Sequence, residues 1–206
     1  VIAVKRREDT KFRAVTDAFP GQLKEWTFGQ EGHIDPADGW VNYLKGLTAA
    51  MAHTGLLAKG LDLAIVGDVP LAAGLSSSGA LVVAFGTAIS DSSQLHLSPM
   101  AVAQLAQRGE HRYVKSACSI MDHMISAMGE QDHALLIDCL DLDSEAISIP
   151  ENLSLIIIDA HIEKQRLAAT NQQRRDECAQ AAEYFGLDAL RHLDLRQLES
   201  AKDKLT

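Results

Sequence analysis

The sequence is short of cysteine, aromatic residues and positive charge, and each shortage argues against a class of protein. Its three cysteines, Cys118, Cys139 and Cys178, are scattered and have the spacing of neither a disulfide framework nor a metal cluster. Basic residues number 19 against 28 acidic ones, so the formal net charge is −9 and no basic patch for nucleic acid is visible. There is no apolar run long enough to span a bilayer and no signal peptide. We therefore expect a cytoplasmic protein without a nucleic-acid or membrane partner.

What the chain does have is enough apolar sequence for a core. It is 206 residues long and 47% hydrophobic, which suits one domain or one domain with part of another. Apolar periodicity and turn residues divide it into strands and helices. The expected strands are Val1–Lys5, Phe12–Thr16, Leu23–Phe28, Leu61–Val66, Ala134–Ile137, Ala146–Ile149 and a buried Leu153–Asp159. The expected helices are Val41–His53, one running from the turn after Leu61–Val66 to Ile89, one starting at Ser98-Pro99, Ser119–Met128, Gln172–Phe185 and Leu195–Lys204.

The most informative segment is the small-residue turn between the strand Leu61–Val66 and the next helix. It reads Pro70-Leu-Ala-Ala-Gly-Leu-Ser-Ser-Ser-Gly-Ala80. The free N–H groups and the dipole of a helix start favour an anion, and small side chains allow its close approach. No lysine of the common P-loop follows the serines. A turn with a serine N-cap is the alternative interpretation.

This segment resembles the phosphate loop of the GHMP small-molecule kinases, and further motifs resemble the galactokinase branch. Trp40-Val-Asn-Tyr-Leu-Lys-Gly46 is similar to its Trp-x-Asn-Tyr-x-x-Gly helix, and Gly109–Tyr113 to its Ala-Glu-His/Asn-x-Phe segment. Cys118-Ser-Ile-Met-Asp-His123 is similar to Cys-Gly-Ile-Met-Asp-Gln, and His133–Cys139 to the strand that follows. The matches keep the family's order from about Trp40 to Cys178.

The resemblance implies an α+β fold and a kinase function. The fold would be a GHMP kinase N-terminal domain, similar to ribosomal protein S5 domain 2, over residues 1–150, with the start of a second α/β domain over 151–206. The activity would be phosphorylation of galactose by ATP and Mg²⁺ to galactose 1-phosphate. The family's N-terminal sugar-binding segment, which carries an arginine, is not found in the chain. We therefore expect a piece of a galactokinase that has little activity alone.

The same resemblance implies roles for individual residues. Asp122 would orient or deprotonate the sugar hydroxyl, although a carboxylate near a helix start also simply favours the helix dipole. Glu110 and Ser78 would be the Mg²⁺ ligands; Glu110 could equally be a solvated helix carboxylate. The remaining nucleotide contacts would come from Pro70, Gly74, Leu75, Ser76, Ser77 and Trp40. Trp40 would lie near adenine, or be a core residue. The histidines His111, His123 and His133 have no metal-ligand spacing, and we expect none of them in catalysis.

Four positions depart from the family pattern. Ala72, Lys115 and Ser119 stand where glycines are usual, and Asn171 replaces a sugar-contacting tyrosine. Because Ser119 and Asn171 would lie beside the substrate, two alternatives stay open. One is a non-catalytic sensor of sugar and ATP; the other is a GHMP kinase for another sugar, for mevalonate or for homoserine. The sequence predicts no oligomeric state.

Overall fold

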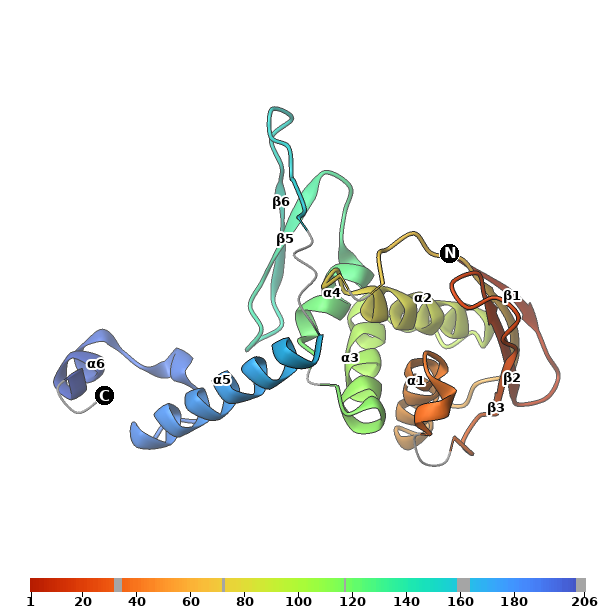
Figure 1. Cartoon of the computed structure of the whole chain (residues 1–206), viewed down its shortest axis with the longest axis horizontal. Coiled ribbons are helices and arrows are strands. Elements are labelled where there is room, and N and C mark those ends of the chain that lie inside the picture. The colour runs from red at the N-terminus through yellow and green to blue at the C-terminus, as the bar shows by residue number, and fades with distance from the viewer. Residues whose placement is uncertain (32–34, 72, 117, 159–163, 203–206) are drawn as a thin grey trace. The chain divides into compact units, whose positions relative to one another are not determined.

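The computed structural model describes the chain apart from residues 32–34, 72, 117, 159–163 and 203–206. It divides into two compact units, Val1–Ile157 and Ile158–Thr206, which are taken separately here (Figure 1). The elements of the first unit are β1 (Ile2–Arg6), β2 (Lys11–Thr16), β3 (Lys24–Thr27), the 3-10 turn η1 (Pro36–Asp38), α1 (Val41–His53), β4 (Leu61–Ile65), α2 (Ser77–Ser92), α3 (Pro99–Gly109), the π-helical turn η2 (Glu110–Val114), α4 (Ile120–Met128), β5 (His133–Ile137) and β6 (Ser144–Ser148). The second holds α5 (Lys164–Tyr184), the 3-10 turn η3 (Leu190–His192) and α6 (Leu195–Ala201).

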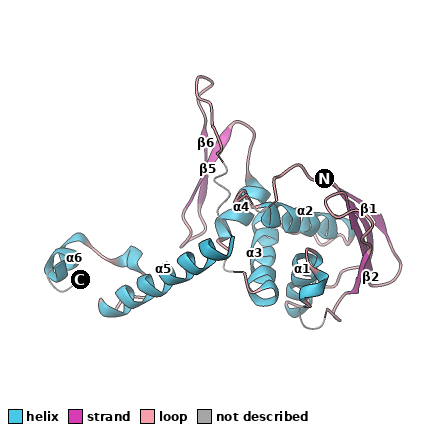
Figure 2. Cartoon of the chain, viewed as in Figure 1, coloured by secondary structure: helices cyan, strands magenta, loops and turns pink. Residues whose placement is uncertain are grey.

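A four-stranded sheet, in the order β1-β4-β2-β3, forms one layer of the first unit. Strands β2 and β4 are parallel, and both other pairs are antiparallel. The parallel pair needs a crossover connection, which α1 supplies. Alternate side chains of β2 and β4 are buried, among them Phe12, Ala14, Leu61 and Leu63. The sheet is therefore covered on one face, where the helices lie (Figure 2).

The core joins this sheet to α1 and α2 through aromatic residues. Phe12 of β2 stacks on Trp26 of β3 with ring centroids 5.1 Å apart, and the edge of Phe85 from α2 meets Phe12 at 5.6 Å. The buried Trp26 Nε1 donates a hydrogen bond to Thr48 Oγ1 of α1 at 3.1 Å, which satisfies the indole N–H. The C-terminal half of α2 is thus held against the sheet, and its N-terminal end is left for the site described below.

Helices α1 and α3 cross at two glycines. A Cβ atom added to Gly109 would lie 2.6 Å from the carbonyl carbon of Gly46, and one added to Gly46 would lie 2.9 Å from the Gly109 carbonyl oxygen. Both contacts are to backbone atoms, which cannot rotate away as a side chain can. The close approach places the C-terminal end of α3, and with it Glu110, against α1.

Helix α3 begins where the sequence predicts. The Ser98 side chain accepts a hydrogen bond from Ala101 N, and Pro99 occupies the first turn. Further along, Ala103 of α3 packs with Ile120 and Met124 of α4, and Leu135 of the β5–β6 hairpin covers them. The predicted pairing of the two hairpin strands is confirmed. None of the described helices combines the length and apolar character that a bilayer-spanning segment needs.

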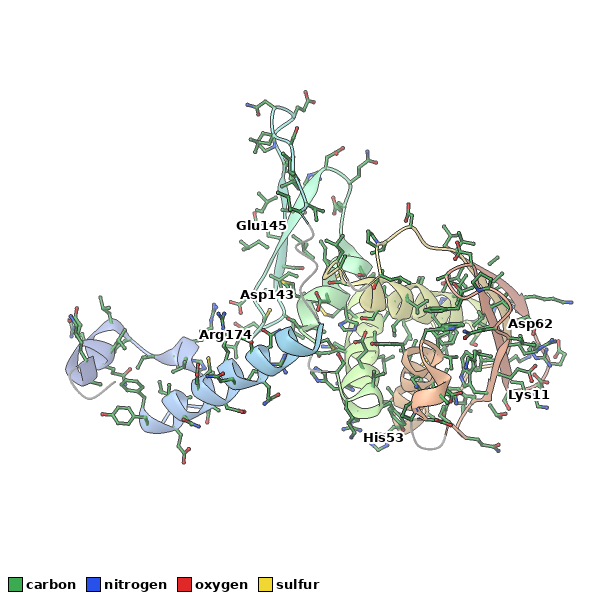
Figure 3. All side chains as sticks on the ribbon, viewed as in Figure 1. Lys11, His53, Asp62, Asp143, Glu145 and Arg174 are labelled. Atoms are coloured by element: carbon green, nitrogen blue, oxygen red, sulfur yellow. The ribbon has the colours of Figure 1, made fainter. Side chains whose placement is uncertain are left out.

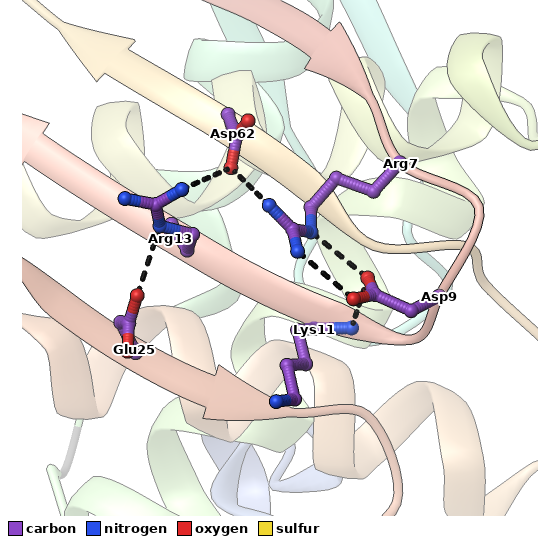
Figure 4. A network of polar contacts seen from close by, with 6 residues as sticks. All are labelled: Arg7, Asp9, Lys11, Arg13, Glu25 and Asp62. Carbon is purple, nitrogen blue, oxygen red and sulfur yellow. Dashed lines mark hydrogen bonds and ion pairs between the residues drawn. The ribbon is translucent and has the colours of Figure 1, made fainter.

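The solvent face of the sheet carries ion pairs (Figure 4), and Asp62, which takes part in them, is labelled among all side chains in Figure 3. Arg7 Nη1 lies 2.9 Å from Asp62 Oδ1, and Arg7 Nε lies 2.8 Å from Asp9 Oδ1. Next to them, Arg13 Nε lies 2.8 Å from Glu25 Oε1. Hydrogen bonds from Arg7 hold the pKa of the Asp9 carboxyl well below its usual range. Because such pairs are open to water, they add little stability, and this face is a solvated surface.

Two expectations about apolar residues are wrong. The apolar spacing of the expected helix Ser119–Met128 predicts that Met121, Met124, Ile125 and Met128 face a core, but Met121 is 51% and Ile125 39% exposed. The inward positions of α4 are Ile120, His123 and Met124, so the buried stripe is shifted around the helix by one residue.

The second error concerns the apolar run expected to form the buried strand Leu153–Asp159. Residues 153–158 are not in a strand and are exposed, while Asp159 lies outside the described residues. A strand needs a neighbour for its backbone groups, and none of the described strands pairs with this run. An apolar run of this kind predicts a buried strand, but burial also requires a pairing strand, and none of the described strands provides one.

Candidate active site

The predicted phosphate turn leads directly into α2. Gly74 (φ 76°) and Ser76 (φ 54°) both have left-handed backbone conformations. Ser76 is the N-cap of α2, yet its side chain makes no capping hydrogen bond. The first N–H groups of a helix have no acceptor within the helix, and this end of the dipole is positive. The alternative interpretation, a turn that serves as a serine cap, therefore does not describe Ser76.

The Ser76 hydroxyl is instead directed at the predicted catalytic carboxylate. Ser76 Oγ donates a hydrogen bond of 2.5 Å to Asp122 Oδ1, across 46 residues of sequence. Asp122 lies in the first turn of α4 and is half-buried. The structure thus brings the turn and this carboxylate into direct contact.

Gly79 makes that contact possible. A Cβ atom at Gly79 would lie 3.1 Å from the backbone oxygen of Asp122 and 3.5 Å from its Cβ. The first turns of α2 and α4 therefore pack at a distance that leaves little room for any larger residue. The other residues assigned to the phosphates are not equally enclosed: Leu75, Ser77 and Ser78 are half-buried, whereas Pro70 and Gly74 are exposed.

Glu110 is not the solvated carboxylate that its charge alone suggests. It begins the π-helical turn η2 after α3 and is 1% exposed. Its Oε1 lies 3.2 Å from Nε2 of His123, which is itself fully buried. The second oxygen, Oε2, is buried and has no hydrogen-bond partner among the described residues. Single-turn π-helices inside α-helical segments occur frequently at functional sites.

These oxygens are compatible with the Mg²⁺ that the family resemblance implies. Mg²⁺ takes hard oxygen ligands and is usually held by one or two protein groups. The unpartnered Oε2 of Glu110 is an oxygen of this kind, and burying it without a partner costs free energy. Ser78, in the first turn of α2, offers a hydroxyl oxygen, which is also a hard ligand. The roles of both residues stay predictions.

The remaining predicted site residues are spread over the chain. Trp40 precedes α1 and stacks on Phe19 with ring centroids 6.4 Å apart, and its buried Nε1 has no partner among the described residues. Ser119 caps α4 by accepting a hydrogen bond from Met121 N at 3.2 Å. Asn171 is exposed on α5, in the second unit. Ala72 lies outside the described residues.

His123 makes a contact that sequence reasoning did not predict. It was set aside because no other histidine stands at metal-ligand spacing, yet its ring contacts Glu110 directly. The available signal was its position next to Asp122, where the resembling motif has glutamine. Burial of His123 beside a carboxylate 13 residues away depends on how α3, η2 and α4 pack, which spacing alone does not reveal.

Lys115, where the family pattern has glycine, has a backbone conformation that favours glycine. It ends η2 with φ 56°, and its N–H donates to the Glu110 carbonyl oxygen. A residue with a Cβ is strained in this left-handed region. The usual glycine is thereby explained by the backbone, and its replacement by lysine carries a cost.

Replacing Lys115 by glycine should therefore stabilise the protein by about 1 kcal/mol. The side chain is exposed, so little contact is lost. Thermal unfolding measures the effect. Lys59, which is also exposed but lacks a positive φ, provides the control, and Lys59→Gly should destabilise. A destabilised Lys115→Gly would show that the left-handed conformation is not strained.

Comparison with known proteins assigns the domain. Residues 42–130, which contain the turn, Glu110 and Asp122, match the family model described as the GHMP kinases N terminal domain. The chain contains a GHMP kinase N-terminal domain. A galactokinase of Pasteurella multocida (strain Pm70) is 34% identical over 209 residues, covering 100% of this chain and 53% of the relative. The chain thus spans about half the length of the curated relative it matches.

Solved structures agree with this GHMP kinase fold. The crystal structure of Lactococcus lactis galactokinase complexed with galactose has a TM-score of 0.81 and 24% identity, over 99% of this chain and 54% of that one. A D-glycero-D-manno-heptose 1-phosphate kinase from Bacteriodes thetaiotaomicron has a TM-score of 0.54 and 14% identity, over 70% of this chain and 46% of that one. The predicted α+β fold is confirmed. The structural match to the galactokinase covers a larger share of this chain than the match to the heptose 1-phosphate kinase.

Proposed function

We propose that the full-length protein, meaning a polypeptide of the relatives' length that carries this chain, transfers the terminal phosphoryl group of ATP to the anomeric hydroxyl of galactose. The observation that carries the proposal is the contact between Ser76 and Asp122, which sets a carboxylate at the open N-terminal end of α2. The 34% identity with a galactokinase supports galactose as the acceptor. The product would be galactose 1-phosphate.

The turn at the start of α2 would hold the phosphates. Free backbone N–H groups of residues 75–78 and the positive end of the helix dipole favour the negative charge of the β- and γ-phosphates. The Ser77 hydroxyl adds a donor, whereas Ser76 contributes its backbone N–H because its hydroxyl donates to Asp122. Gly74 keeps the approach free of side-chain atoms. Trp40 would supply an aromatic face near the adenine.

Asp122 would act on the sugar. A carboxylate within hydrogen-bond reach of the anomeric hydroxyl can orient it and accept its proton as the oxygen attacks the γ-phosphorus. The attack forms the sugar O–P bond and breaks the bond between the γ-phosphorus and the bridging oxygen, with ADP as the leaving group. In this step the Ser76 hydroxyl stabilises the ionised carboxylate by donating to Oδ1.

Glu110 and Ser78 would hold Mg²⁺, which when bound neutralises charge on the phosphates. His123 keeps Oε1 of Glu110 occupied, so Oε2 is the oxygen left for the metal. Ser119 and Asn171 would lie near the sugar and affect the choice of acceptor. The hydroxyl of Ser119 is already engaged in capping α4, which limits how it could contact a substrate.

The test is a phosphoryl-transfer assay of the full-length protein with ATP, Mg²⁺ and a panel of sugars. Formation of galactose 1-phosphate, followed by ³¹P NMR, is the expected result. Calorimetric binding of galactose without turnover would instead identify a sensor. Turnover only with another acceptor would identify a GHMP kinase of different specificity. Either outcome would contradict the proposed reaction.

A further inference from the structure

Beneath the proposed site, the structure brings together three groups that are ligands of soft and borderline metals. Glu110, Cys118 and His123 each offer one ligand atom, and these atoms all lie within 4.8 Å of one another. Glu110 and His123 are fully buried, and Cys118 is half-buried. The three come from η2, from the segment after it and from α4, so only the folded chain assembles them.

We propose that Glu110, Cys118 and His123 form a binding site for zinc. Zinc takes carboxylate oxygen, thiolate sulfur and imidazole nitrogen in tetrahedral geometry. With bonds of about 2.0 Å, two such ligands stand about 3.3 Å apart. The separation of Glu110 Oε1 and His123 Nε2 is 3.2 Å, so this pair already has the required spacing. The Cys118 sulfur lies within 4.8 Å of the other two ligand atoms, and water can complete the coordination from its half-buried side.

The hydrogen bonding of His123 is consistent with a cation between the two buried groups. Its Nδ1 lies 3.3 Å from the Ser119 carbonyl oxygen, which can only accept, so Nδ1 carries a hydrogen. In a neutral imidazole Nε2 then presents a lone pair, and it faces the lone pairs of Glu110 Oε1. A proton or a metal ion must lie between them. A backbone carbonyl that orients the ring from its far side is the usual support of a metal-binding histidine.

A second observation points to a ligand as well. Oε2 of Glu110 is buried without a hydrogen-bond partner among the described residues, a state that a cation held by both carboxylate oxygens would relieve. On the other side, the Cys118 carbonyl oxygen lies 2.8 Å from His111 Nε2, which holds the cysteine backbone in place. Burial, with the negative charge of Glu110, raises the pKa of the Cys118 thiol to about 12.

This donor set separates zinc from Mg²⁺. Thiolate and imidazole favour zinc, whereas Mg²⁺ prefers oxygen ligands. Both ions would draw on the Glu110 carboxylate, so zinc would inhibit phosphoryl transfer by taking that group from Mg²⁺. This consequence rests on the proposed kinase function, but the zinc site itself does not, and a binding measurement tests it separately.

Cobalt(II), which replaces zinc in thiolate sites and absorbs light there, is the probe. Titrated into the full-length protein, it should produce a thiolate-to-cobalt charge-transfer band that one equivalent of zinc abolishes. The band should be absent in Cys118→Ser, and His123→Gln should bind cobalt at least about tenfold more weakly. Cys139→Ser, which alters an exposed cysteine, is the matched control and should keep the band.

Circular dichroism of each variant shows whether it is folded, and His123→Gln provides an independent reading should Cys118→Ser fail to fold. Absence of the charge-transfer band from the folded protein at excess cobalt would overturn the proposal. So would a band of equal intensity in folded Cys118→Ser, or unchanged cobalt affinity in folded His123→Gln.

Discussion

Replacing Asp122 by asparagine in the full-length protein should lower kcat for phosphoryl transfer by about 10²–10⁴-fold, the usual contribution of a positioned general base. Asparagine has nearly the same shape, and its Oδ1 can still accept the hydrogen bond from Ser76. The contact between α2 and α4 should survive, and only the proton acceptor is lost. The affinity for MgATP, measured by calorimetry, should therefore change little.

Asp68→Asn is the control for this prediction. Asp68 is an exposed carboxylate just before the predicted phosphate turn. Asp68→Asn therefore removes one negative charge near the turn, as Asp122→Asn does. Its substitution should leave kcat within about twofold, since surface changes away from a reacting group have small effects. If Asp122→Asn kept the turnover of this control, the assignment of Asp122 to the acceptor hydroxyl would be wrong.

The largest expected effect on stability is that of Gly109→Ala. The new Cβ would lie 2.6 Å from the carbonyl carbon and 2.7 Å from the carbonyl oxygen of Gly46, so α1 and α3 would have to separate. We expect a loss of about 3 kcal/mol in the free energy of unfolding, measured by chemical denaturation. Helix propensity alone predicts the opposite, a gain of about 1 kcal/mol. The sign of the change in the free energy of unfolding thus shows whether the clash with Gly46 or the helix propensity of alanine dominates.

Gly67→Ala is the matched control, because a Cβ there would meet nothing within 4 Å and the backbone has no positive φ. Its effect should stay within about 0.5 kcal/mol. Gly109→Ala should also lower kinase activity, since Gly109 directly precedes Glu110. A variant that is stabilised, or as stable as the Gly67 control, would show that the crossing of α1 and α3 is looser than described.

The sequence was sufficient where a local rule determines the structure. The bounds of Val41–His53, the cap at Ser98 and the pairing of β5 with β6 follow from periodicity, capping and turn residues, and all are confirmed. The sequence was insufficient where the burial of a residue depends on how its helix packs against another element. The exposure of Met121 follows from how α4 turns toward α3, and an apolar stripe on one helix does not reveal this.

The candidate site shows the same division. Motifs indicated the turn before α2, Asp122 and Glu110 as candidates, because phosphate chemistry restricts residue types over short stretches, and their roles stay predictions. The pairing of Glu110 with His123 and the turning of Ser76 toward Asp122 were not predicted. Both contacts join elements that meet only after α2, η2 and α4 have packed, so they required the fold.

The most direct test of the central claim is a crystal structure of the full-length protein with galactose, Mg²⁺ and a non-hydrolysable ATP analogue. We expect the phosphate oxygens to accept hydrogen bonds from the backbone N–H groups of residues 75–78. The anomeric hydroxyl should lie about 3 Å from an Asp122 carboxylate oxygen. Phosphates bound away from the start of α2, or a sugar hydroxyl beyond the reach of Asp122, would contradict the claim.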